Sequence, residues 1–589
     1  MYPQKFYVEK TTGTPADTQI AYGLARVIEK LVPEDNDLDL KIEDLGDSYC
    51  VALNYPLEET WVEQAEFFPL LRALDTAKKS SGIPNSVDYV AHQQRNNAYF
   101  EARKKGLKEN DLAEQGLVPP ALDWPCWAII NQMAATSGYN AMITNWHLHK
   151  DCFPELIKII LMLFGDRVND SDAAEEKWAA IAKTNGLNIK AQTSQLQVLN
   201  PGMGKGGNKS KASGLSIGGL NGFWLIEYLK FSGMFYAAIP RVVSNSKDRK
   251  TYVLRPKSLD WRTHSKVFAE FQNALYAQTP VKMDVLAVIR YCQVFLKQWK
   301  AGQGTSAFRF IRGRPGDHVA AIEAIHYKHL GNAHATMNLS TINLPQWLGE
   351  VESVEQADLF LNMLAEHETI LRNLEEKNSR ENALLRHYRD FLSARDLKSF
   401  YRFTAIYAGY VMSKLIAGGF PPRRFHISNL EVLIVNHNPK LATIVHNSGF
   451  CRIAEAIRNS TVRPQYHKSK NNPGPFEIRY GLGSDLLRNA SYPEKFAQAL
   501  SKFMFEYNQE NGRVNERFRN KPPVRRKNIR TEDIEQVLTL IDEYRDSETI
   551  ANLLVAFGYA SDPQNRGGQD FEENNDEQGV NHDAAEIVE

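Results

Sequence analysis

The 589-residue chain has few cysteines and no long apolar run. Its five cysteines are odd in number and form no C-x-x-C pair, which argues against a disulfide framework or a zinc knuckle. The most apolar run, Leu156 to Phe164, spans nine residues and contains Lys158, so it is too short to cross a bilayer. The sequence therefore predicts a soluble protein of the reducing cytoplasm with no membrane partner. The cysteines are Cys50, Cys126, Cys152, Cys292 and Cys451.

Acidic residues are also absent from one long stretch, Lys177 to Ile226. Within it, eight glycines fall among the 23 residues from Asn200 to Gly222, and three lysines lie between them. Glycine lets the backbone approach a partner closely and expose its N–H groups, and lysine beside such amides suits phosphate. We therefore expect this segment to contact a polyanion. Its candidate DNA-binding residues are Lys205, Asn208, Lys209 and Lys211.

The charge of the chain balances overall but is unevenly distributed. With 70 basic and 70 acidic residues the net charge is zero, yet residues 177–259 hold thirteen Lys and Arg against two acids. Residues 451–530 hold 17 basic and 7 acidic residues, whereas residues 1–60 and 531–589 are acidic. Two basic zones between acidic ends favour a nucleic-acid surface, with a merely solvated charged face as the alternative.

Each basic zone offers further candidate residues. In the first, Ala237 to Val243 and Lys250 to Arg255 resemble a hairpin, whose basic residues would extend the duplex-binding surface. In the second, aromatic residues interleave with the basic ones, a combination that suits unpaired bases. The hairpin candidates are Arg241, Lys247, Arg249 and Lys250. The candidates of the second zone are Arg423, Arg424, Arg452, Arg458, Arg463, Lys468 and Lys470, with Tyr466, Phe476 and Tyr480 among them.

The hydrophobic periodicity predicts an α+β protein. Ile20 begins a series of apolar residues at helical spacing, and Asp17 or Thr18 is the expected N-cap of this helix. Residues 60–185 are mostly helical in pattern, and the pattern stays largely helical after Ser258. From about Ser353 onward only long helices with short breaks are expected. We therefore expect a mixed α/β N-terminal body at 1–350, a helical bundle at 351–560 and a disordered acidic tail at 561–589.

Motifs for an enzyme are weak. The string Gly202-x-Gly204-x-x-Gly207 matches a dinucleotide fingerprint as text, but that fingerprint must open a helix at once, and here the glycines continue. Two histidine clusters, one at Trp146 to Cys152 and one at His326 to His334, lack the partner spacing of a zinc site. We predict no catalytic residue, no metal and no cofactor. The alternative is a metal- or nucleotide-dependent nucleic-acid-processing enzyme that uses these histidines or glycines.

Three segments carry a resemblance to a known family. They are Thr11-Thr12-Gly13-Thr14-Pro15, Asn200-Pro201-Gly202-Met203-Gly204-Lys205-Gly206, and Ile478-Arg479-Tyr480-Gly481-Leu482-Gly483 with a downstream Leu487-Arg488. With them the chain resembles the large-subunit family of the type I CRISPR effector complex, Cascade, in its I-B-like branch. Members of that branch also occur beside CRISPR-associated transposons.

The resemblance implies a non-enzymatic role in RNA-guided antiviral defence. An α/β body would recognise the protospacer-adjacent motif (PAM) in target DNA, and a helical bundle would hold the displaced strand of the R-loop. Sequence would be read by the CRISPR RNA, while protein supplies shape and backbone contacts. The implied partners are target DNA, CRISPR RNA, the backbone and small subunits of Cascade, and a helicase-nuclease or transposition proteins.

The glycine-rich segment gives a first prediction. Replacing Lys205, Lys209 and Lys211 together with alanine should weaken target binding by the assembled complex, because each lysine is expected to neutralise a phosphate. The slope of log affinity against log salt concentration should fall by up to about three units. An unchanged affinity and slope in a salt titration would exclude this segment as a DNA contact.

Overall fold

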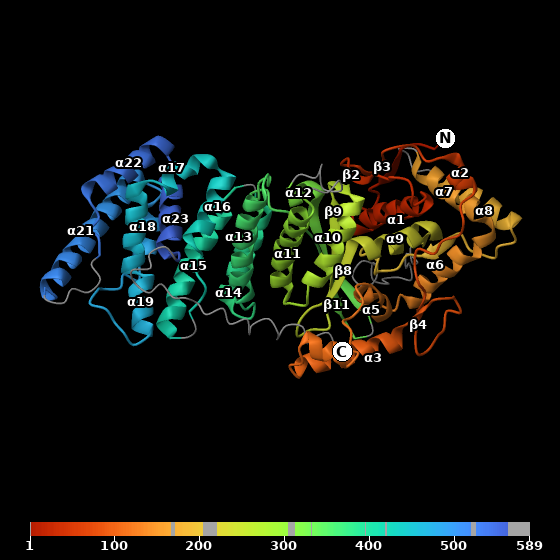
Figure 1. The fold of residues 1–589 in the computed structure, drawn as a ribbon, viewed down its shortest axis with the longest axis horizontal. Helices are drawn as coiled ribbons and strands as arrows, with labels where there is room; N and C mark the ends of the chain where they lie inside the picture. The colour runs from red at the N-terminus through yellow and green to blue at the C-terminus, as the bar shows by residue number, and fades with distance from the viewer. Residues whose placement is uncertain are drawn as a thin grey trace, which may run out of the picture. The chain divides into compact units, whose positions relative to one another are not determined.

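In the computed structural model, the described residues are 2–165, 171–203, 221–303, 313–331, 333–394, 396–418, 421–519 and 526–562. They divide into two compact units, with the boundary between Leu344 and Pro345. The first contains every named strand and the second is helical, so the predicted α+β class is confirmed (Figure 1). Most of the predicted tail, 563–589, lies outside the described residues. Within these ranges no helix combines the length and the hydropathy needed to span a membrane.

Two four-stranded antiparallel sheets form the framework of the first unit. The first has the order β1-β3-β2-β10 and the second β12-β11-β9-β8. The bounds are β1 (Lys5–Glu9), β2 (Leu40–Asp44), β3 (Ser48–Leu53), β10 (Ser258–Asp260), β8 (Ala238–Val242), β9 (Arg249–Pro256), β11 (Val319–His329) and β12 (His334–Asn343). Two short pairs are added, β4 (Leu74–Asp75) with β5 (Val87–Asp88) and β6 (Gln192–Ser194) with β7 (Asn221–Phe223).

Helices complete the first unit. They are α1 (Pro15–Leu31), α2 (Glu59–Glu63), α3 (Tyr89–Lys104), α4 (Glu109–Glu114), α5 (Trp124–Gln132), α6 (Thr136–Leu148), α7 (Phe153–Gly165), α8 (Ser171–Thr184), α9 (Trp224–Ala237), α10 (Trp261–Ala274), α11 (Pro280–Ala301) and α12 (Pro315–His318). The predicted N-cap of α1 was wrong. Thr14 caps it by accepting a hydrogen bond from the Ala16 N–H, and Asp17 instead accepts one from the Thr12 N–H.

A close helix crossing lies at the centre of this unit. Helix α1 packs on strands of both four-stranded sheets and on α9, which Figure 1 shows beside it. Gly23 and Gly233 lie at the crossing, where a Cβ added to Gly23 would stand 2.1 Å from the Leu229 carbonyl oxygen. A Cβ on Gly233 would stand 1.8 Å from the Gln19 carbonyl oxygen. Only glycine therefore allows these backbones to approach so closely.

The β11–β12 hairpin corrects the sequence-based expectation, which treated this region as helical. Val319, Ile322 and Ile325 are fully buried and recur every third residue, so their spacing imitates a helix. The strand instead pairs with β9 on one side and β12 on the other. Because residues of both strand faces are buried, the two-residue alternation of an exposed strand is missing.

The second unit consists of helices packed around aromatic side chains. Trp347 stacks on Phe391 at a centroid separation of 4.7 Å, and Phe400 stacks on the ring of His367. Burial lowers the pKa of His367 to about 3, so this imidazole is neutral. The helices are α13 (Val354–Arg372), α14 (Ser379–Ser393), α15 (Lys398–Ala417), α16 (Ile427–His437), α17 (Ala442–Val445), α18 (Ser448–Ser460), α19 (Val462–Ser469), α20 (Leu482–Asn489), α21 (Pro493–Arg517), α22 (Thr531–Tyr544) and α23 (Ser547–Tyr559).

The α1–α9 crossing gives a second prediction. Gly23→Ala should lower the unfolding free energy by about 1–3 kcal/mol, because the new methyl group can fit only if the helices separate. Gly512→Ala is the matched control, since it lies inside α21 with no atom near its missing Cβ. There the better helix propensity of alanine should leave stability unchanged or slightly higher. Thermal unfolding of both variants tests this, and equal melting temperatures would contradict the role of the crossing.

Candidate nucleic-acid interface

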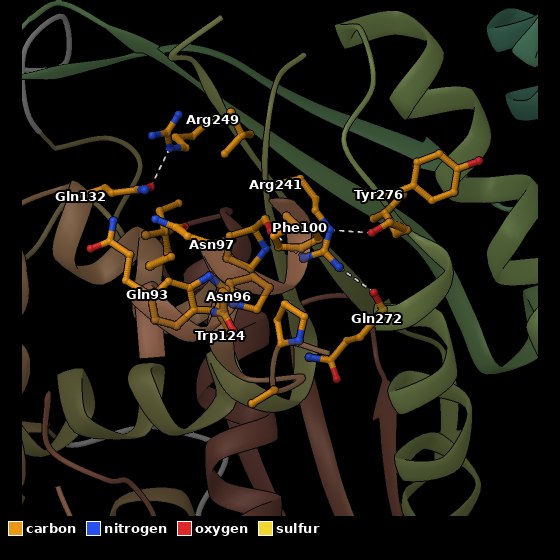
Figure 2. Close-up of a pocket in the computed structure, with 18 of the residues that line it drawn as sticks. Gln93, Asn96, Asn97, Phe100, Trp124, Gln132, Arg241, Arg249, Gln272 and Tyr276 are labelled. Carbon is orange, nitrogen blue, oxygen red and sulfur yellow. Dashed lines mark hydrogen bonds between the residues drawn. The ribbon is translucent and has the colours of Figure 1, made fainter. Parts of the chain in front are cut away.

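The first unit contains a cavity of about 740 Å³ (Figure 2). Helix α3 contributes residues at helical spacing, Tyr89, Gln93, Asn96, Asn97, Phe100, Arg103 and Lys104, so a single face of this helix forms one wall. Helix α5 contributes Trp124, Ala128 and Gln132, which are also one turn apart. The β8–β9 hairpin and the end of α10 close the remaining sides.

The lining of this cavity, which we call the amide cavity, has an unusual composition. Among the described lining residues there is no aspartate or glutamate. Side chains that donate and accept hydrogen bonds stand beside cations and aromatic rings. The amides are Gln93, Asn96, Asn97, Gln132, Asn245, Gln272 and Asn273, and the cations are Arg103, Lys104, Arg241, Lys247 and Arg249. Cations suit phosphate, amides suit the edges of bases, and aromatic rings suit their faces.

Arg241 lies on β8 and points toward the end of α10 (Figure 2). Its Nε donates to the Leu275 carbonyl, its Nη2 donates to the Gln272 carbonyl, and its Nη1 donates to the carbonyl of Pro240 at 2.9 Å. Burial lowers the pKa of Arg241 to about 10, so the guanidinium stays charged at neutral pH. All three acceptors are neutral carbonyls, and the positive charge is therefore not cancelled by a carboxylate hydrogen bonded to it.

Strand alternation separates the two basic residues that follow the turn. Arg249 is 5% exposed, and its Nε donates to Gln132 Oε1 at 2.8 Å, which Figure 2 marks. Lys250 is equally buried but forms an ion pair with Asp284 and donates to the Pro280 carbonyl at 3.0 Å. Arg249 therefore lines the amide cavity, whereas Lys250 joins strand β9 to α11 through its contacts with Asp284 and Pro280. Burial also lowers the pKa of Arg249.

Lys247 is the exposed one of the four basic residues predicted in the β8–β9 hairpin. It lies in the β8–β9 turn, two residues after Asn245, whose φ of 58° is left-handed. The predicted hairpin is confirmed, with Arg241 opposite Lys250. Of the four basic residues predicted there, Arg241, Lys247 and Arg249 line one cavity.

Both ends of the glycine-rich segment are fixed, although Lys205, Asn208, Lys209 and Lys211 lie outside the described residues. Asn200 is buried and donates to Glu227 Oε2 at 2.9 Å, while it accepts from Lys230 Nζ at 2.7 Å. Lys230 and Glu227 form a buried ion pair at 2.6 Å on α9. At the far end, Asn221 begins β7, which pairs with β6.

The predicted residues of the second unit divide into buried and peripheral ones. Arg458 is 2% exposed, donates to Asp562 Oδ2 at 3.1 Å and to the Phe557 carbonyl at 3.0 Å, and so joins α18 to α23. Arg424 donates to the Ala560 carbonyl at 3.1 Å, and the Arg423 carbonyl accepts from the Tyr407 hydroxyl. Arg452 pairs with Glu455 one turn away on α18. The structure thus places Arg458 inside the fold, where it holds helices together.

A second group lies together on α19 and near α21. Arg463 donates to Asn459, Lys468 is exposed beside the Tyr480 hydroxyl at 3.4 Å, and exposed Lys470 lies 5.6 Å from the Tyr466 ring. Helix α18 ends at Ser460, so Arg452 and Arg463 are on different helices. The group of Arg463, Lys468 and Lys470 with Tyr466 and Tyr480 is here called the α19 cluster.

Two further arginines lie near this cluster and were not among the predicted sites. Arg479 pairs with Glu510 at 2.7 Å, and the Arg526 guanidinium lies 3.4 Å from the centre of the Phe476 ring. Burial, together with the charges of Arg479 and Arg463, lowers the pKa of Arg526 to about 10. The charges of Arg463, Arg479 and Arg526 thus lie close enough to influence one another. Arg479 and Arg526 are separated in sequence by two helices, α20 and α21, so the sequence gave no sign of this proximity.

In the first histidine cluster, His149 has an ordinary structural role. His149 donates from Nδ1 to the Asn145 carbonyl at 2.7 Å and accepts from Trp178 Nε1 at 3.0 Å, which satisfies both ring nitrogens. In the second cluster, His326 Nε2 lies 3.6 Å from Asp248. Across the described ranges, no three His, Cys, Asp or Glu side chains are grouped to hold a metal ion.

No family model matches the chain, and a search of curated proteins finds no match.

The amide face of α3 was missed by the sequence analysis, which treated residues 60–185 only as helical. A signal was present, because Gln93, Asn96 and Asn97 recur at three- and four-residue spacing with Tyr89 and Phe100 on the same face. Such a face is too polar for an ordinary core and contains no acid.

The cavity gives a third prediction, which compares two neighbouring basic residues. Lys247→Ala should weaken nucleic-acid binding and reduce the salt slope by about one unit, with no change in melting temperature, because this side chain is exposed. Arg249→Ala should instead lower the unfolding free energy by about 1–3 kcal/mol, since it leaves the buried Asp248 carbonyl and the half-buried Gln132 Oε1 without this donor. Binding isotherms at several salt concentrations and thermal unfolding distinguish the two. A Lys247→Ala variant with an unchanged salt slope would contradict the assignment.

Proposed function

We propose that this protein is a non-enzymatic, DNA-binding large subunit of a type I CRISPR RNA-guided surveillance complex, acting in the cytoplasm. The observation that carries the proposal is the acid-free lining of the amide cavity, in which cations, amides and aromatic rings converge within the N-terminal unit. Cations that meet phosphates and amides that meet base edges are the kinds of side chain through which proteins contact nucleic acid. The three sequence segments that resemble the Cascade large subunit support the same function.

The first unit would recognise the PAM and contact duplex DNA. The anchored ends of the glycine-rich segment support this role, because Asn200 is held by the buried Lys230–Glu227 pair. A segment whose ends are fixed loses less conformational entropy when it binds than one that is free at both ends. Its lysines would meet phosphates, and Asn208 would contact a base edge.

The second unit would stabilise the displaced strand of the R-loop through the α19 cluster. Binding of single strands needs backbone charge and stacking platforms, and the cluster offers three cations with two tyrosines. Arg458 is not proposed as a DNA contact, because its guanidinium donates hydrogen bonds to Asp562 and to the Phe557 carbonyl.

The α19 cluster gives a fourth prediction. Replacing Arg463, Lys468 and Lys470 with alanine should weaken binding of the assembled complex to a target with an unpaired non-target strand. The salt slope should fall by up to about two units, the value for three contacts to a single strand. Binding to a short duplex that carries only the PAM should be unaffected. Equal losses on both DNA molecules would exclude the cluster as the holder of the displaced strand.

A control and a direct test of the competing function accompany this experiment. Arg458→Ala should act through stability alone, with a loss of about 3–5 kcal/mol for a broken buried ion pair.

The enzyme alternative is tested by metal analysis of the purified protein together with incubation on labelled DNA and RNA. Stoichiometric zinc or manganese accompanied by cleavage would overturn the proposed non-enzymatic role.

A further inference from the structure

The size of the amide cavity limits what can enter it. Its volume of about 740 Å³ lies in the range of small-molecule sites, roughly 300–1,000 Å³. A double helix cannot enter a space of this size, whereas a single unstacked nucleotide can. Enzymes that act on a base use pockets of this kind, which receive the nucleotide outside its stack.

The amide side chains of the lining suit the edge of a base, although Gln93 is exposed and Asn97 half-buried. Gln93 and Asn97 are one turn apart on α3 and both line the cavity, so their amides lie on the same side (Figure 2). Asn96 is 6% exposed, and within the described parts of the chain its Nδ2 has no hydrogen-bond partner. A buried amide donor without a partner costs free energy, and a ligand that accepts its hydrogen bond removes that cost. Amides present donors and acceptors together, as base edges do.

The aromatic rings differ in their availability. Trp124 is covered on one face by Tyr89, at 5.0 Å between centroids, and stacks with His92 at 6.3 Å, so it supports the wall. Tyr99 and Tyr276 are only partly buried, and Arg290 lies over the Tyr276 ring at 3.8 Å. A partly exposed ring in the lining can receive the face of a base.

The cations of the lining suit the phosphate of such a ligand. Lys104 and Lys247 are exposed, and Lys104 pairs with Glu101 on the same helix at 3.6 Å, a surface ion pair that a phosphate can compete with. Arg241 donates hydrogen bonds to three carbonyls, so it would attract a phosphate through its positive charge and not through a direct hydrogen bond. Because no acidic residue is among the described lining residues, nothing there repels a phosphate.

We propose that the amide cavity binds one unstacked nucleotide, with its base against the amides of α3 and its phosphate near Lys104 and Lys247. This rests on the proposed function, because a subunit that opens duplex DNA produces unpaired nucleotides beside it. A free mononucleotide has the same chemistry, and the experiment therefore distinguishes the two sources.

The test uses the purified full chain and three probes. They are a duplex with one unpaired 2-aminopurine in a bulge, the same duplex fully paired, and free 2-aminopurine nucleotide monophosphate. Base entry into the cavity should change the 2-aminopurine emission of the bulged duplex, and this duplex should bind more tightly than the paired one.

Two variants locate the binding. Ala128→Phe adds a ring to a partly exposed lining residue and so obstructs part of the cavity without removing a side-chain hydrogen bond. It should weaken binding of the bulged duplex about tenfold, the order expected for one lost stacking contact, and leave the paired duplex unaffected. The double variant Lys104→Ala/Lys247→Ala changes only exposed side chains and should weaken binding of every probe that enters the cavity. Lys5→Ala/Lys297→Ala, which replaces two exposed lysines outside both basic zones, is the control of equal charge.

The outcomes are separable. If the bulged and paired duplexes bind alike and Ala128→Phe changes neither, the nucleotide site is wrong, even where duplex binding itself supports the proposed function. If the free nucleotide binds and Ala128→Phe prevents it while no duplex binds, the site stands with a free ligand and the proposed function fails. If Ala128→Phe does not fold, an unchanged affinity of the bulged duplex in the lysine double variant overturns the proposal.

Discussion

The first unit depends on the close approach of α1 and α9 at Gly23 and Gly233. This crossing places α9 where Glu227 and Lys230 can form a buried pair, and the pair holds Asn200 at the start of the glycine-rich segment. The same helix continues directly into β8, which carries Arg241. A wider crossing would therefore displace the anchor of one candidate DNA contact and the strand of the other.

Sequence could predict the α+β class and the basic zones, because composition and helical periodicity are local properties. It failed at β11, where Val319, Ile322 and Ile325 have helical spacing and only pairing with β9 and β12 defines a strand. The β8–β9 hairpin was predicted correctly, because its turn residues separate two apolar runs. The strand conformation of β11 instead depends on its pairing with other segments, including β9, which is far from it in sequence.

The candidate site was predictable only in part for the same reason. Local charge identified Arg241, Lys247 and Arg249, but not whether each faces solvent or a partner. Gln132 and Asp284, which bind Arg249 and Lys250, come from helices on either side of the hairpin in sequence. The α3 amides carried a periodic signal that charge counting ignores, since amides carry no charge. Charge thus located the region, and tertiary contacts determined its composition.

The buried and half-buried cations of this unit fall into two kinds, and the difference bears on binding. Lys230 and Lys250 each pair with a carboxylate, so their charges are neutralised within the fold. Arg241 donates its described hydrogen bonds to three carbonyls, and burial lowers its pKa to about 10. Perturbed charges of this kind are common at functional sites. The nucleotide proposed for the amide cavity would compensate this charge, because its phosphate would lower the potential that the guanidinium creates there.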